Sequence, residues 1–323
     1  MASITEPVNG VVEWIDRLQR RHPLLGFPYA VIKRYGEDHG GWLGALISYY
    51  GFFSLYPLLV VFTTIASWVL KDRPETLQRV LEALWSRVPF VSDALSAQVA
   101  AQVERLTGHG WVLFLSVLVV LWGGFGVVRL LQDTVNTIWG VPRYRRPGFF
   151  PKLLRGLLII GMLGLGIIGT AVVAGLTLAV DFPVVAAVGA AIANIVLSAG
   201  LTIALYHIII ATSVRTVDLL PGALITAIGT YLVTLVGGLY VKHVIARMTG
   251  LYGPFATTIG LLAYVSVLVQ IFVFGTEVNV VRAKRLWPRA MRPELGPADH
   301  RAIELTMQRE ALLSIDDPRG SRT

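Results

Sequence analysis

The chain of 323 residues contains no cysteine and few charged residues. Without cysteine it can form no disulfide, no thiolate metal site and no cysteine nucleophile. Charged side chains make up only 15% of the residues, whereas soluble domains carry about 25%. The six histidines are scattered, with no pair at metal-ligand spacing, so no metal or other cofactor is expected. A cleavable signal is not expected either, because the first residues contain no short apolar core after a basic start.

Apolar residues are abundant, at 54% of the chain, and they are gathered in long runs. A helix that crosses a bilayer needs about 20 predominantly apolar residues. Six runs reach that length, and they cover residues 42–70, 111–131, 153–180, 184–211, 219–241 and 254–281. The sequence therefore predicts an all-α, polytopic membrane protein with six transmembrane helices.

The basic residues predict the orientation of these helices. With the N- and C-termini both cytoplasmic, 21 of the 28 Lys and Arg residues lie on the inner side, as cytoplasmic segments usually require. Residues 1–41 then form a cytoplasmic amphipathic arm, residues 42–285 the six-helix transmembrane domain, and residues 286–323 a cytoplasmic tail. The tail is expected to be partly disordered, with one helix near 298–313. Two short amphipathic helices are expected on the outer surface, within 71–110.

Polar side chains interrupt the apolar runs near their predicted inner ends. The clearest case is Glu277, which is followed by Asn279 before the last run has ended. A charge within the hydrocarbon costs roughly 2.5–3.5 kcal/mol, so Glu277 should face a partner or water. Other runs place polar residues at the same depth. The complete set of candidate site residues is Ser48, Tyr49, Tyr50, Ser54, Arg129, Asp133, Asn136, His207, Glu277 and Asn279.

Two interpretations of these ten residues stay open at this point. They either line a polar vestibule that opens to the cytoplasm, or they form a buried structural network with some interfacial side chains. In a vestibule, Arg129 would attract a phosphate group, and Asp133 and Glu277 would hold Arg129 or titrate. The two tyrosines and Asn136 would supply hydrogen bonds. The vestibule would bind a substrate, whereas the network would only hold helices together.

Several short motifs occur in a specific order along the runs. They are Tyr49-Tyr50 followed by Ser54-x-x-Pro57, Asn136-x-x-Trp139, Pro221-Gly222-Ala223, the Tyr-Gly pair of YGPFATTIG, and Gly275-Thr276-Glu277-Val278-Asn279. In order and spacing, over about residues 28–285, these motifs resemble the YihY/BrkB family of bacterial inner-membrane proteins. Thr276 stands where that family usually has alanine, which is a small exchange. The resemblance implies a multi-pass protein of the bacterial cytoplasmic (inner) membrane.

The resemblance also bears on function. A subset of the family is linked to the export of lipids or lipopolysaccharide precursors, and other members carry a ribonuclease BN label. Nuclease chemistry needs clustered carboxylates or histidines at a metal. The sequence contains no such cluster, so neither an enzyme nor a nucleic-acid partner is predicted.

The preferred function is transport of an amphipathic lipid or lipid precursor across the membrane. Membrane lipids are the expected partners, with anionic lipid at the basic cytoplasmic segments. A non-transporting scaffold that recruits partners is the alternative, and an intramembrane enzyme is the least favoured reading. A homo-oligomer or a protein partner stays open.

Overall fold

The computed structural model describes residues 16, 18–19, 22–70, 73, 75–76, 78, 125–177, 183–240, 254–291 and 295–310. These residues form helices and connecting turns and contain no β-strand. The helices are α2 (Pro23–Glu37), α3 (Gly40–Val69), an unlabelled helix over residues 125–138, the short 3-10 helix η1 (Arg143–Arg145), α7 (Phe149–Thr177), α8 (Pro183–Ile209), α9 (Thr216–Tyr240), α11 (Pro254–Ala283) and α12 (Pro297–Glu310). The all-α prediction is confirmed for this part of the chain.

Four of the described helices are long and apolar enough to cross a membrane. Their spanning segments are Phe149–Thr170, Val184–Ile209, Thr216–Gly237 and Thr258–Ala283. In hydrocarbon every backbone N–H and C=O must be paired within the protein, and a continuous helix achieves this. The first predicted run, 42–70, coincides with the 30-residue helix α3.

The six-span count and the cytoplasmic placement of both termini stay predictions. Residues 111–124 of the second run and almost all of the segment 71–110, with its two outer-surface helices, lie outside the described residues. The same holds for most of the N-terminal arm before residue 22 and for the tail beyond residue 310.

Helix starts and stops follow local chemistry. The helices α2, α8, α11 and α12 all begin with proline, which lacks an N–H and has a φ angle suited to the first turn. The helix 125–138 ends at Gly140, whose φ of 67° reverses the chain. Val141 N–H then donates to Asn136 O at 2.8 Å, and Gly140 N–H donates to Thr137 O at 3.0 Å. This pair of bonds is a Schellman stop.

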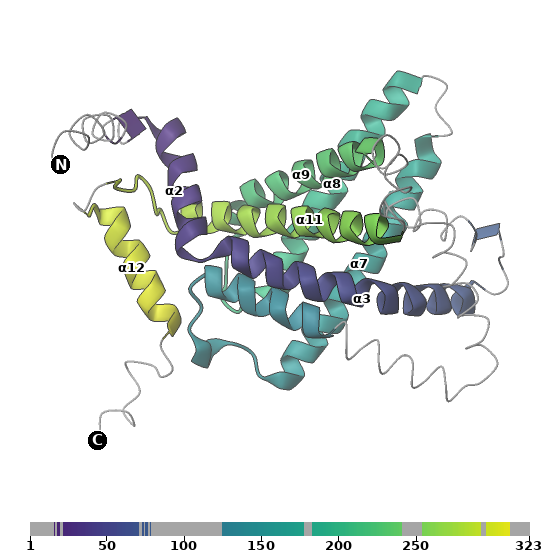
Figure 1. Ribbon diagram of the computed structural model, residues 1–323, viewed down its shortest axis with the longest axis horizontal. Coiled ribbons are helices and arrows are strands. Elements are labelled where there is room, and N and C mark those ends of the chain that lie inside the picture. The colour runs from purple at the N-terminus through teal and green to yellow at the C-terminus, as the bar shows by residue number, and fades with distance from the viewer. Residues whose placement is uncertain are drawn as a thin grey trace.

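The central helix of the bundle is α11. It packs against α9, α3 and α2, while α8 joins α9 to α7. Figure 1 shows α2 and α12, the first and last helices labelled there, at the same end of the bundle. We call this end the inner end; α3 and α9 begin near it, and α8 and α11 end near it. Away from it, the spanning helices expose large apolar side chains such as Leu165, Val188 and Leu235, as expected for surfaces that face lipid.

Candidate functional site

Arg129 and Asp133 form an ion-paired group with α7. Arg129 Nε lies 3.9 Å from Asp133 Oδ2, and the Arg129 side chain is 61% exposed. Lys152 Nζ, on α7, donates to Asp133 Oδ1 at 2.5 Å. Asp133 therefore ties the helix 125–138 to the start of α7 and leaves Arg129 on the surface.

Asn136 and Asn279 join helices through their backbones. The buried Asn136 amide donates to Ile209 O at 3.0 Å, and its Oδ1 accepts from Ala211 N at 2.9 Å. It thereby satisfies backbone groups at the end of α8, which have no partner within that helix. In the same way, Asn279 Oδ1 accepts a hydrogen bond from Gly222 N at 2.7 Å. Both amides connect elements that lie more than 50 residues apart.

The candidate residues on α3 and α8 interact with neighbours that are close in the sequence. Ser48 Oγ donates to Gly44 O at 2.6 Å, and Ser54 Oγ donates to Gly51 O at 3.0 Å. Tyr49 and Tyr50 are exposed, and their rings meet edge to face with 5.6 Å between the ring centroids. The exposed His207 lies 3.1 Å from the Thr216 hydroxyl.

Glu277 is completely buried on α11. Neither carboxyl oxygen has a hydrogen-bond partner within the described residues. The charged groups that act on it are Asp38, Arg34, Arg309 and Glu37, which belong to α2, the α2–α3 junction and α12. In the described part of the chain, no hydrogen bond or ion pair joins Glu277 to Arg129 or Asp133. The structure thus shows no direct pairing of Glu277 with these two residues, and a substrate-binding role for the ten candidates stays a prediction.

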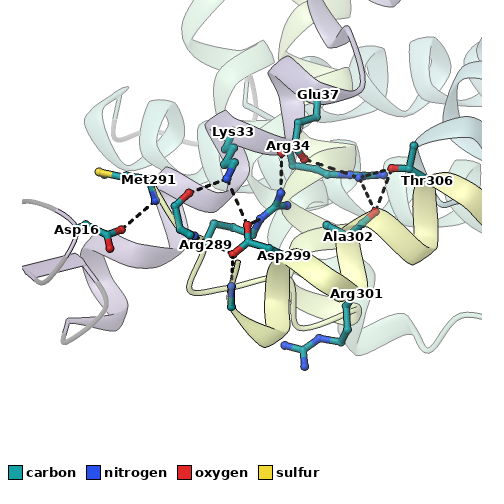
Figure 2. A network of polar contacts seen from close by, with 12 residues as sticks. Asp16, Lys33, Arg34, Glu37, Arg289, Met291, Asp299, Arg301, Ala302 and Thr306 are labelled. Carbon is teal, nitrogen blue, oxygen red and sulfur yellow. Dashed lines mark hydrogen bonds and ion pairs between the residues drawn. The ribbon is translucent and has the colours of Figure 1, made fainter. Parts of the chain in front are cut away.

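A charged cluster that the sequence did not reveal lies at the inner end and joins α2 to α12. Its first centre is the buried Asp299 of α12 (Figure 2). Asp299 Oδ1 accepts from Arg289 Nε at 2.7 Å and from Lys33 Nζ at 3.3 Å. Its Oδ2 accepts from the backbone amides of Ala290 and Gly296, at 3.0 and 3.1 Å. Two cations and two amides thus hold one carboxylate.

The second centre of the cluster is Asp38, where α2 ends. Arg34 Nε lies 2.8 Å from Asp38 Oδ2, and Arg309 Nη1 donates to Asp38 Oδ1 at 2.6 Å. Arg34 also donates to Thr306 Oγ1 at 3.2 Å, which is visible in Figure 2. Beside it, Leu305 of α12 packs on Gly140, where an added Cβ would lie only 2.3 Å from a leucine methyl carbon. We call α2, residues 285–291 and α12 the inner cap.

The pKa of Asp299 shows how strongly the inner cap prefers this carboxylate ionised. Burial alone raises the pKa, but the hydrogen bonds from Arg289, Ala290 and Gly296, together with the charge of Lys33, lower it from 3.8 to about 2. The pKa of Asp299 in the folded protein lies below its unfolded value, so the ionised carboxylate stabilises the folded protein, and this stabilisation is fully present above about pH 4. It is lost as the pH falls from about 4 to about 2.

We therefore expect docking of α12 to weaken by about 2 kcal/mol between pH 5 and pH 2. An environment-sensitive dye on a cysteine introduced at the exposed Glu304 would report this release. Asp299→Asn is the control. In this variant α12 should dock more weakly at pH 5, and its docking should not weaken further between pH 5 and pH 2 through this side chain. An unchanged pH profile in that variant would contradict the assignment.

A cavity of about 830 Å³ lies between α7, α8 and α9, at the middle of their spanning segments. None of the ten candidates lines it. Its lining is mostly apolar, with no charged side chain, and it consists of Ile159, Met162, Leu163, Gly166, Thr170, Asn194, Leu197, Ser198, Leu201, Thr202, Leu205, Ala227, Thr230, Tyr231, Thr234 and Leu235. The Thr202 and Thr234 hydroxyls donate to backbone carbonyls of their own helices, at 2.7 and 2.8 Å. Their oxygens can still accept a hydrogen bond.

Comparison with known proteins places the chain in a family. The family model described as "Virulence factor BrkB" matches residues 31–295. The chain is 22% identical over 169 residues to the inner membrane protein YhjD of Escherichia coli (strain K12), covering 50% of this chain and 49% of that protein. It is 25% identical over 128 residues to an uncharacterized protein of Dickeya dadantii (strain 3937), covering 39% of this chain and 38% of that one. The matches thus span about half the length of these relatives or less, and no solved structure matches. Since the family model covers most of the chain, this multi-pass inner-membrane protein belongs to the BrkB family.

Proposed function

We propose that the protein moves an amphipathic lipid or lipid precursor between the two leaflets of the inner membrane. The observation that supports this most directly is the cavity between α7, α8 and α9. Its volume, about 830 Å³, falls within the range of roughly 300–1,000 Å³ that is usual for ligand sites. It lies at the depth of the lipid chains, since its walls are the middle parts of spanning segments.

The lining favours an apolar chain over a charged solute. A phosphate or another ion would need cationic walls or a dense set of donors. This lining has no charged side chain, and its hydroxyl groups are few among apolar residues. A lipid chain that enters from the bilayer exchanges one apolar environment for another. The Thr202 oxygen, which already donates within α8, can accept from a neutral hydroxyl or amide group near the start of such a chain, whereas Thr234 Oγ1 also bonds the Tyr264 hydroxyl at 3.3 Å.

The headgroup requires a separate place at the inner end. Arg129 exposes most of its side chain there, and Asp133 holds it from one side only. In the proposed function Arg129 attracts a lipid phosphate, as the sequence suggested, while the chain occupies the cavity. A scaffold that moves nothing would use neither feature.

Filling the cavity is expected to stop transport. Ser198 lines the cavity, so Ser198→Phe should occupy it and slow lipid movement by about tenfold or more. The measurement is transfer of fluorescent phospholipids between leaflets of liposomes that contain the purified protein. Val196→Phe is the matched control, because Val196 is exposed on the same helix and outside the cavity lining. Equal rates in wild type, Ser198→Phe and protein-free liposomes would refute transport.

A further inference from the structure

The segment that joins the helix 125–138 to α7 presents a basic surface beside exposed aromatic rings. Arg143 and Arg145 of η1 are both exposed, and the Arg145 guanidinium lies 5.5 Å from the centre of the Tyr144 ring. Phe149 and Phe150, the first residues of α7, are 60% and 79% exposed. We call these five residues the η1 surface.

The sequence around η1 is strongly basic. Residues 141–155 contain five basic side chains and no acidic one. Asp133, on the preceding helix, offsets one of these charges through its 2.5 Å contact with Lys152. Within the described residues, Arg143 and Arg145 lie at the opposite end of this segment from Lys152.

The loop that carries the two arginines is fixed before any ligand binds. Arg145 N–H donates to Pro142 O at 3.0 Å, and Arg146 Nε donates to Val141 O at 3.1 Å. Pro142 and Pro147 restrict the backbone on either side of η1. A rigid surface of this kind loses little conformational entropy when it binds a partner.

The depth of the η1 surface decides which partner fits. The spanning segment of α7 starts at Phe149, so η1 lies at the boundary between hydrocarbon and water. Aromatic rings are favoured at that boundary, and clusters of Lys and Arg next to a transmembrane helix attract anionic lipid. A nucleic acid or an acidic protein would leave both phenylalanines in water.

We propose that the η1 surface is a binding site for an anionic phospholipid. The lipid phosphate accepts hydrogen bonds from Arg143 and Arg145, and an acyl chain packs against Phe149 and Phe150. The site is independent of the proposed transport, because it does not involve the cavity.

The test compares two double variants of the full-length protein in detergent. Phosphatidylglycerol and phosphatidylcholine are titrated, and bound lipid is counted by native mass spectrometry. Arg143→Gln with Arg145→Gln should weaken phosphatidylglycerol binding by about 20-fold and leave phosphatidylcholine binding unchanged. Arg282→Gln with Lys284→Gln is the matched control, since it removes two exposed cations near the same end without neighbouring exposed phenylalanines. Its effect should be smaller than that of the arginine pair, because these two cations have no exposed phenylalanine beside them that could hold an acyl chain.

Two outcomes would overturn the proposal. An equal loss of phosphatidylglycerol in both double variants would mean that only the general charge of the inner end matters. Displacement of the lipid by inorganic phosphate would assign the surface to a free anion. As a further check, Phe150→Ser should reduce lipid binding while the melting temperature stays unchanged, because the Phe150 ring is 79% exposed; Phe149 is left in place, since its ring also contacts Phe125.

Discussion

Replacing Asp38 with alanine is expected to lower the free energy of unfolding by about 3–5 kcal/mol and to release α12. Asp38 is bound by Arg34 at 2.8 Å and by Arg309 at 2.6 Å. The Arg34 and Asp38 side chains are both fully buried. Arginine does not lose its proton under ordinary conditions, so without Asp38 the buried Arg34 charge would keep only Glu37, 4.0 Å away, as a carboxylate partner. Denaturant unfolding in mixed micelles, together with the dye at position 304, would measure both effects.

Two further variants make this prediction specific. Asp218→Ala removes the partner of Arg215, which is 89% exposed at 3.5 Å from the carboxylate, and it should cost less than about 1 kcal/mol. The triple variant Arg34→Met, Asp38→Leu, Arg309→Met replaces the whole buried group with apolar side chains. It should recover most of the stability, since none of the three charges of this group is left buried without its partner. A triple variant as unstable as Asp38→Ala would show that the charges themselves hold the cap.

The inner cap is the part of the fold that sequence reasoning missed. The helix near 298–313 is confirmed as α12, because Ala298, Ala302 and Leu305 recur at helical spacing and are buried. Its docking site was not foreseen. Asp38 and Arg309 are 271 residues apart, and in a single sequence each looks like an ordinary charge on a soluble arm or tail. The Arg34 and Asp38 pair, four residues apart on one helix face, was the one local signal.

The four spans that the structure describes were predictable, because the length of an apolar run determines where a helix can lie in a bilayer. The run 254–281, for example, became the helix Pro254–Ala283. The cost of burying a polar group also showed correctly that Asn136 and Asn279 need partners. It could not show which partners, because a backbone amide of a neighbouring helix satisfies an asparagine as well as a ligand does. In the structure the Oδ1 atom of Asn136 accepts from Ala211 N, just after α8, and that of Asn279 accepts from Gly222 N on α9, while Asn279 Nδ2 has no partner within the described residues.

Replacing Gly222 with alanine is expected to cost about 3 kcal/mol of stability, because it overpacks a close crossing of α9 and α11. A Cβ at Gly222 would lie 1.9 Å from Gly275 O, and a Cβ at Gly275 would lie 2.7 Å from Gly222 O. These are backbone atoms, so no side-chain rotation relieves the clash. Small residues allow this kind of approach between helices in lipid. Gly222 and Gly275 also belong to two of the family-like motifs, and the crossing gives those motifs a structural reason.

Gly200 supplies the control for this prediction. It lies on α8 with no atom within 4 Å of an added Cβ, so Gly200→Ala should be neutral or stabilise by up to about 1 kcal/mol through its higher helix propensity. The two glycine variants of the crossing must also be coupled. Once Gly222→Ala has forced α9 and α11 apart, Gly275→Ala meets less resistance, so the double variant should lose less stability than the sum of the single losses. Thermal unfolding of the four variants in detergent measures these differences, and fully additive losses would mean that the two glycines do not share one contact.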